Sequence, residues 1–280
     1  MQTKKLKLLS NSIRQNIIIM LEKAKSGHCG GALGMVDILC VLYFEELKHN
    51  PKKPNWKERD FFILSNGHTN PVLYATLAEA GYFKKKELLT LRKIGSRLQG
   101  HPHYGVLPGV ENSGGPLGQG ISQAVGLAAS LKRERKKNRV YCFVGDGEIE
   151  EGECWEALLF ANKEQLDNLV VIVDYNHIQI DGDPDEVIHL GSLTKKFSAF
   201  NFRTIEFDGN SILQIKKVFS EVKKLKGKPI CLIANNIPGK GVSFMENDFH
   251  WHGKAPNEVE TKMALEELNE ERIKIKNEKN

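Results

Sequence analysis

Two apolar runs in the sequence end in polar, turn-forming residues that could bind a ligand. Gly145-Asp146-Gly147 ends the first run, and Asn176 follows the second run about 30 residues later. Glycines on both sides of Asp146 let the backbone approach a ligand closely, and the carboxylate suits a hard cation. A structural turn alone also explains Gly-Asp-Gly. A carboxylate, the amide oxygen of Asn176 and a main-chain carbonyl leave positions open around magnesium, so the pair predicts a metal shared with a diphosphate.

The surrounding sequence predicts the elements that position these residues. Apolar runs typical of buried strands cover residues 61–64, 140–144, 169–173 and 230–234, with a weaker run at 202–205. Apolar residues at helical spacing predict helices over 6–24, 35–47, 70–80, 121–132, 154–165 and 212–225. This alternation predicts an α/β fold, a parallel sheet with helices on both faces. Ligands of such sheets bind at the carboxyl ends of the strands, where Asp146 and Asn176 fall.

A long loop and a charged end complete the predicted organisation. Residues 95–120 are rich in glycine and proline, and loops of this length are usually functional. Residues 258–280 are dominated by Glu and Lys in a helical pattern. We find no internal repeat and no linker, and therefore expect one domain over residues 1–257, followed by a charged helical tail over residues 258–280.

The composition argues against several other classes of protein. The chain has 40 Lys and Arg against 35 Asp and Glu, but its basic clusters are dispersed and lack interleaved aromatic residues, so we expect no nucleic-acid partner. The apolar runs are too short to span a bilayer, and we find no secretory signal, so we expect no membrane association. Five cysteines form no CxxC pair, which predicts reduced, mostly buried thiols and a cytoplasmic protein.

Several further motifs follow one another along nearly the whole chain. They are Ser26-Gly27-His28, Leu64-Ser65-Asn66-Gly67-His68, Gln99-Gly100-His101-Pro102, Gly115-Pro116-Leu117-Gly118-Gln119-Gly120, Gly145 to Gly152 and Trp251-His252-Gly253. Together with Asn176 they resemble the thiamine diphosphate motif, and specifically the N-terminal half of transketolase. The resemblance implies the thiamine diphosphate-binding fold, thiamine diphosphate with Mg²⁺ or Ca²⁺ as cofactors, and transfer of a two-carbon ketol unit from a ketose (by default a phosphate) to an aldose.

The resemblance implies a role for each matching residue at the cofactor. Asp146 and Asn176 match the metal-binding side chains, and Ile178 matches a metal ligand through its main-chain carbonyl. Gly147 matches an amide that contacts the diphosphate. His68 matches a histidine near the diphosphate and the reacting centre.

The same correspondence covers the rest of the expected site. Gly115 and Leu117 match a loop along the pyrimidine side of the cofactor. Glu151 matches an acidic residue that links paired active sites across a dimer interface. His252 matches a further histidine at the diphosphate and the reacting centre. The neighbouring acidic residues Glu148, Glu150 and Glu153 are expected to form a solvated or helix-starting cluster.

Histidines match the expected substrate contacts. His28 and His101 match residues that contact the hydroxyls of the sugar, and His28 and His252 are expected at the reacting hydroxyls. Imidazoles suit this work because they hydrogen-bond hydroxyls and exchange protons near neutral pH. His28, His68 and His101 each follow a glycine and could instead lie in ordinary turns. Cys29 stands where the family usually has proline, and we do not expect it to be catalytic.

Two alternatives stay open beside the transketolase interpretation. The cofactor-binding subunit of a 2-oxo acid dehydrogenase shares Gly-Asp-Gly and the later Asn, although residues 115–120 and Trp251-His252-Gly253 favour transketolase. A non-catalytic scaffold subunit would tolerate the loss of the metal ligands and histidines that this chain retains. The resemblance ends soon after Gly253 and so implies a complementary C-terminal transketolase subunit, in a heterotetramer with two copies of each chain.

Overall fold

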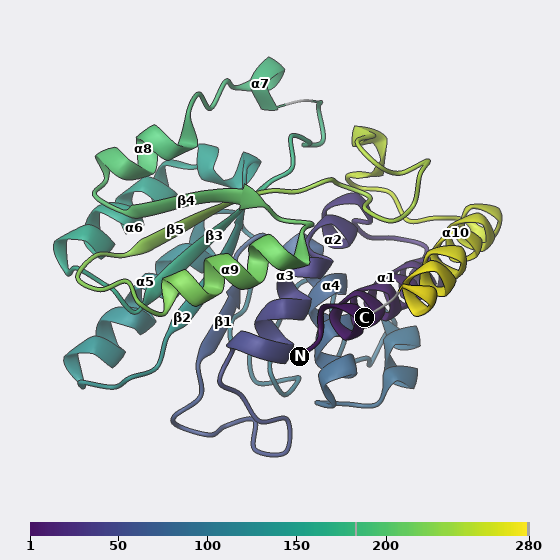
Figure 1. The fold of residues 1–280 in the computed structure, drawn as a ribbon, viewed down its shortest axis with the longest axis horizontal. Coiled ribbons are helices and arrows are strands. Elements are labelled where there is room, and N and C mark those ends of the chain that lie inside the picture. Colours follow the sequence, from purple (N-terminus) through teal and green to yellow (C-terminus); the bar gives the residue numbers. More distant parts are fainter. Residues whose placement is uncertain (183, 279–280) are drawn as a thin grey trace.

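A five-stranded parallel sheet runs through the computed structural model, which describes residues 1–182 and 184–278 (Figure 1). Its order is β1-β2-β3-β5-β4. The strands are β1 (Phe61–Leu64), β2 (Val140–Gly145), β3 (Leu169–Tyr175), β4 (Arg203–Asp208) and β5 (Ile230–Asn235). Gly145 lies beside Asp174, and Tyr175 beside Asn235, so the central strands end at one edge. The predicted α/β class and all five predicted strands are confirmed.

Helices cover both faces of the sheet. One face carries α1 (Thr3–Ala24), α2 (Gly30–Gly34), α3 (Val36–Val41), α4 (Asn70–Ala80) and α9 (Ile212–Val222). The other carries α5 (Gln119–Arg133), α6 (Gly152–Lys163) and α8 (Leu193–Ala199), while α7 (Pro184–Val187) lies between β3 and α8 in the chain. The chain moves along the sheet in one direction from β1 to β4 and then steps back to β5. Because such crossovers are right-handed, this reversal places α9 on the face of the sheet opposite to α6 and α8.

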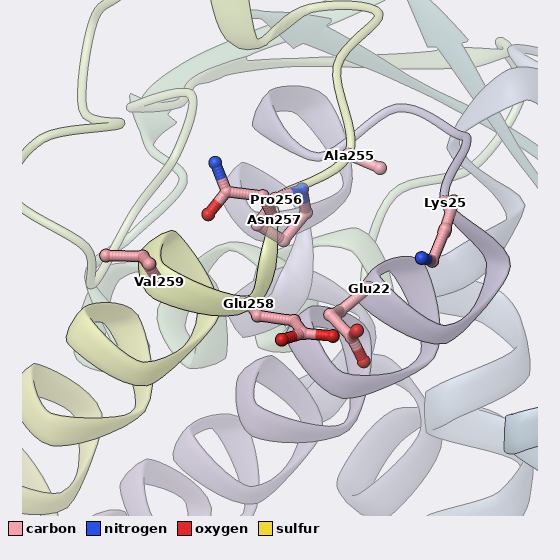
Figure 2. A pocket seen from close by; sticks show the side chains of 7 residues that line it. All are labelled: Glu22, Lys25, Ala255, Pro256, Asn257, Glu258 and Val259. Atoms are coloured by element: carbon pink, nitrogen blue, oxygen red, sulfur yellow. The ribbon is translucent and has the colours of Figure 1, made fainter.

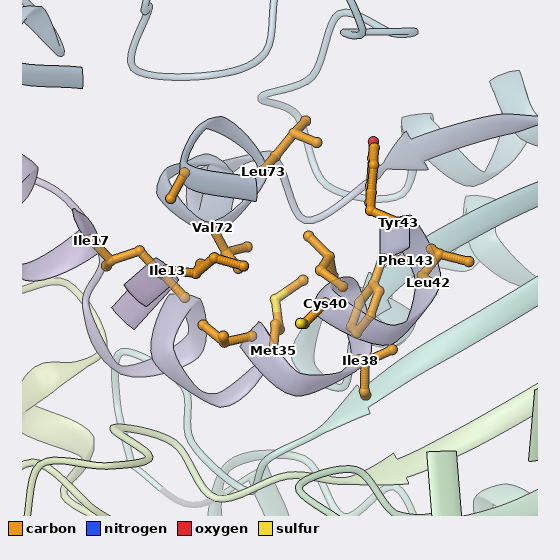
Figure 3. Close-up of a cluster of buried hydrophobic side chains, with 14 of the residues drawn as sticks. Ile13, Ile17, Met35, Ile38, Cys40, Leu42, Tyr43, Val72, Leu73 and Phe143 are labelled. Carbon is orange, nitrogen blue, oxygen red and sulfur yellow. The ribbon is translucent and has the colours of Figure 1, made fainter. Parts of the chain in front are cut away.

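The strands are apolar throughout because both of their faces are covered. Along β2, Tyr141 and Phe143 pack into the core under α1, α3 and α4, whereas Cys142 and Val144 pack under α5 and α6. Figure 3 shows the first of these cores, where Phe143 lies with side chains from α1, α3 and α4. All five cysteines fall within the described residues and are buried free thiols. Burial raises the pKa of Cys29 to about 12, which agrees with a non-catalytic thiol.

Several helical segments differ from the sequence prediction, which placed no helix at α7 or α8. The helix expected over residues 35–47 ends as a π-helical turn at Leu42–Glu46. Helix α2 was not predicted because its sequence is Gly-Gly-Ala-Leu-Gly, which has low helix propensity. The glycines serve packing: a Cβ at Gly34 would lie 2.9 Å from the carbonyl oxygen of Ile237.

The charged C-terminal segment forms helix α10 (Glu258–Asn277), which packs along α1 (Figure 1). Ala264 and Leu268 are buried there, and the side-chain amide of Asn11 donates to the carbonyl of Leu268 at 2.8 Å. The division between a domain over 1–257 and a tail over 258–280 stays a prediction. Among the described residues, none of the helices has the length and apolar character to cross a membrane.

Candidate functional site

A cavity of about 220 Å³ opens at the carboxyl ends of β1, β2 and β3. The polar turns that follow the three strands converge on it, joined by the loop before α5 and the segment after β5. Nine of the predicted site residues line it: His28, His68, Leu117, Asp146, Gly147, Glu151, Asn176, Ile178 and His252. His101 and Gly115 are outside that lining.

Asp146 lies in a compact nest of main-chain amides. Its Oδ1 accepts a hydrogen bond from the amide of Gly147 at 2.8 Å, and its Oδ2 accepts from the amides of Asn176 at 3.0 Å and His177 at 2.8 Å. These bonds tie the end of β2 to the end of β3. A carboxylate has about four acceptor sites, so one remains for a cation.

A second buried carboxylate, that of Asp174, supports this nest from the second-last residue of β3. It accepts hydrogen bonds from the side-chain amides of Asn176, at 2.8 Å, and Asn236. The amide nitrogen of Asn176 therefore faces Asp174, and its oxygen, which accepts from the amide of Ile178 at 3.0 Å, faces the other way. Sequence reasoning gave Asp174 no role, because its side-chain partner Asn236 is distant in the chain.

The two carboxylates repel each other in a dry environment. Burial and the charge of Asp174 raise the pKa of Asp146 to about 7, against the effect of the three amides. Burial raises the pKa of Asp174 to about 6. A bound cation would relieve this repulsion, so the electrostatics of the pair favour a metal.

Three histidines form a cluster above the carboxylates. The ring centroid of His28 lies 4.8 Å from that of His68 and 5.6 Å from that of His252, and the His68 and His252 centroids are 5.4 Å apart. Burial, with the neighbouring imidazoles, lowers the pKa of His28 to about 4 and that of His68 to about 3. Burial also lowers the pKa of His252, whose ring hydrogen-bonds the main chain of Ile178. The cluster is therefore neutral at pH 7 and able to donate to and accept from hydroxyl groups.

His101 and Gly115 meet at the rim of the cavity. A Cβ on Gly115 would lie 3.7 Å from Cγ of His101, and Gly115 has φ of 143°, a conformation that favours glycine. His101 is exposed, and its neighbour Gly115 lies close to the residue before His68, since a Cβ on Gly67 would lie 3.1 Å from the main-chain nitrogen of Gly115. The predicted residues therefore gather in one region, with His101 on its outer side.

Glu148 corrects one sequence expectation. Instead of a solvated residue, it is buried and accepts hydrogen bonds from the Ser65 hydroxyl and the amides of Gly118 and Gly145. Burial raises the pKa of Glu148, and these three bonds oppose the shift. A glutamate beside exposed glutamates gave no signal of this role.

The donor set fits a metal and a polar cofactor. Nδ1 of His28 and Oδ1 of Asn66 are buried without a hydrogen-bond partner among the described residues, and both residues line the cavity. No group of three or more His, Cys, Asp and Glu side chains in the described part of the chain could hold a metal. The predicted ligands are different in kind, since they are one carboxylate, one amide oxygen and one carbonyl.

A second, more open cavity of about 500 Å³ lies between the end of α1 and the start of α10 (Figure 2). Glu22 and Glu258 extend towards each other across it. Asn257 and Glu260 already cap the start of α10 through a reciprocal pair of side-chain to backbone bonds. The lining includes no predicted site residue, and we assign it no function.

Comparisons with known proteins agree with this arrangement. The family profile described as "Transketolase, thiamine diphosphate binding domain" matches residues 6–278. An apulose-4-phosphate transketolase subunit from Phocaeicola vulgatus is 37% identical over 280 residues, covering 100% of this chain and 99% of the relative. The 6-deoxy-6-sulfo-D-fructose transketolase subunit SqwG from Clostridium sp. is 38% identical over 262 residues, covering 94% of this chain and 95% of the relative.

A solved structure gives the same result. The transketolase of Campylobacter jejuni superposes with a TM-score of 0.86 at 32% identity, covering 99% of this chain. The chain spans 48% of that transketolase, so it matches nearly the full length of the subunits and about half of the larger enzyme. The chain therefore belongs to the transketolase family and carries its thiamine diphosphate-binding domain.

Proposed function

We propose that this chain is the cofactor-binding subunit of a two-subunit transketolase. The complex transfers a two-carbon ketol unit from an anionic ketose to an aldose. The observation that carries this proposal is that Asp146, with its main-chain amides, and the cluster of His28, His68 and His252 line one and the same cavity. Relatives of the same length are named as transketolase subunits, which supports a complementary subunit. We also propose a heterotetramer with two copies of each chain, and a cytoplasmic location, which the buried free thiols support.

Asp146, Asn176 and the carbonyl of Ile178 would hold Mg²⁺ or Ca²⁺, and Gly147 and His68 would contact the diphosphate. Glu151 would lie towards the paired site of the second copy. Gly115 and Leu117 would lie along the pyrimidine ring. When bound, thiamine diphosphate supplies the nucleophilic carbon and the electron sink that cleavage of a ketose requires.

The histidines would act on the sugar. Neutral His28 and His252 would each hydrogen-bond a hydroxyl at the reacting carbon atoms and hold or release its proton. The two rings lie edge to face, so their nitrogens can hydrogen-bond different hydroxyls of one substrate. His101, at the rim, would bind a hydroxyl farther along the donor.

The test is a screen of donors and acceptors with the chain and its complementary subunit combined. Ketose phosphates and a sulfonated ketose are supplied with several aldoses, and products are separated by mass. We expect a ketose two carbons longer than the aldose supplied, together with an aldose two carbons shorter than the donor. Absence of thiamine diphosphate binding by the combined chains with magnesium present would support a scaffold, and decarboxylation of a 2-oxo acid would support the dehydrogenase subunit.

His101→Ala is expected to impair use of the donor and leave cofactor affinity unchanged. Loss of a hydrogen bond to a neutral hydroxyl corresponds to a rise of about three- to tenfold in donor KM. The measurement compares donor KM with the Kd of thiamine diphosphate. His103→Ala is the matched control, because His103 is also exposed and lies two residues away. A changed cofactor Kd with an unchanged donor KM would show that the assigned role is wrong.

A further inference from the structure

Helix α5 begins without a capping side chain of its own. Its N-cap residue is Gly118, which has φ of 80° and no side chain that could accept a hydrogen bond from the first turn. The first amides of a helix have no partner inside the helix and need acceptors from elsewhere. Gly118 and Ile121 are buried, so water cannot freely supply those acceptors.

Two residues from other elements supply them. The amide of Ile121 donates to Oγ of Ser65, the residue directly after β1, at 3.1 Å. The amide of Gly118 donates to Oε1 of Glu148, which follows shortly after β2, at 2.9 Å. The hydroxyl of Ser65 in turn donates to the same Oε1 at 2.5 Å.

The other oxygen of this carboxylate completes the connection. Oε2 of Glu148 accepts from the amide of Gly145, at the end of β2, at 3.1 Å. The Glu148 side chain is 2% exposed and Ser65 is 0% exposed, so the bonds lie in a dry interior. A negative charge at a helix N-terminus is also favoured by the helix dipole.

The packing around these bonds is tight enough to fix the start of α5. A Cβ on Gly120 would lie 2.5 Å from Cα of Ser65, which no side chain can satisfy without a backbone shift. Leu117, immediately before Gly118, lines the cofactor cavity together with Glu148. A displacement of Gly118 would therefore move Leu117 in the cavity.

We propose that Glu148 is a positioning residue: its carboxylate, with Ser65, holds the loop of residues 115–120 in place against the cavity. This inference rests on the proposed function, because the loop is the one expected along the pyrimidine ring. Glu148 acts through Gly118 and Leu117, and it needs no contact with the substrate.

The test is Glu148→Gln, which keeps the shape of the side chain. Oε1 accepts from Gly118 and Ser65, and Oε2 from Gly145, so either orientation of the new amide directs its nitrogen at a backbone N–H. We expect hydrogen exchange at residues 115–121 to accelerate about tenfold or more, because a buried bond to a charged group is lost. We expect the Kd of thiamine diphosphate, measured by calorimetry with magnesium, to rise about tenfold.

Glu153→Gln is the matched control, because Glu153 is exposed at the start of α6 and five residues from Glu148. It is expected to match the unmodified chain in both measurements. Unchanged exchange in folded Glu148→Gln would overturn the proposal, and so would faster exchange over the whole sheet. Faster loop exchange with an unchanged cofactor Kd would overturn the link to the cofactor.

Ser65→Ala provides a second test if Glu148→Gln does not fold. It removes the acceptor for Ile121 and leaves the carboxylate in place, and we expect faster exchange at residues 118–121. Unchanged exchange in this variant would overturn the proposal. Failure of the unmodified chain, combined with its complementary subunit, to bind thiamine diphosphate would instead refute the proposed function, and the exchange experiment would still decide whether Glu148 holds the loop.

Discussion

The purified chain, supplied with magnesium and thiamine diphosphate, is expected to transfer no ketol unit until the complementary subunit is added. Its cavity brings the proposed metal ligands and the histidines together at one edge of a single sheet. By the family resemblance, the next domain of the family holds the pyrimidine ring of the cofactor and supplies the glutamate that protonates it. Loss of a general acid alone lowers rates by about 10²- to 10⁴-fold, and loss of half of the binding surface adds to this.

The experiment measures ketol transfer by each of the two chains separately and by their mixture. A mixture prepared with Asp146→Ala is the control, since it assembles the same surfaces without the charged ligand. Substantial turnover by the present chain without its partner would contradict the two-subunit proposal. Turnover by the partner without the present chain would assign the chemistry elsewhere.

The sequence predicted the sheet well because apolar runs and the turns after them are local signals. The runs at 140–144 and 169–173 are buried on both faces, and so they occur in the sequence as continuous apolar runs, whose short length and bounding turn residues indicate strands. The carboxyl-end rule then placed Asp146 and Asn176 together, as the structure has them. His28 and His252 are more than 200 residues apart in the chain, and only the family resemblance joined them.

The supporting carboxylates could not be predicted in the same way. Asp174 lies within a strand and Glu148 within a run of acidic residues, so neither has a distinctive neighbourhood in the sequence. Their roles come from partners that are distant in the chain, such as Asn236 for Asp174 and Ser65 for Glu148. Burial of a charged group becomes visible once the fold has closed around it, and its hydrogen-bond partners then identify its role.

Asp146→Ala is expected to abolish activity at ordinary cofactor concentrations. It removes the charged side chain that we propose as a metal ligand and leaves the amides of Gly147, Asn176 and His177 without their acceptor. We expect the Kd of thiamine diphosphate in the presence of magnesium to rise about 100-fold or more, since loss of an outer partner alone costs about 10- to 100-fold. Asn176→Ala removes a neutral ligand, so we expect a rise of about tenfold that excess magnesium and cofactor partly restore.

Asp146→Asn separates the loss of the metal ligand from damage to the fold. In the cofactor-free chain, burial and Asp174 raise the pKa of Asp146 to about 7. The carboxyl group therefore ionises more readily in the unfolded chain, which lowers the stability of the folded state. The cost grows as pH rises from the unfolded pKa, about 3.8, through 7. The nitrogen of the Asn amide meets a main-chain N–H in either orientation, which lowers the Tm at every pH. The Tm deficit of cofactor-free Asp146→Asn relative to the unmodified chain is therefore expected to be smaller at pH 8 than at pH 5. Calorimetry of both chains at the two pH values, followed by cofactor titration, measures both quantities. Full cofactor affinity in Asp146→Asn would contradict the metal assignment, whereas a Tm deficit that is larger at pH 8 than at pH 5 would show that the ionised carboxylate stabilises the fold without a metal.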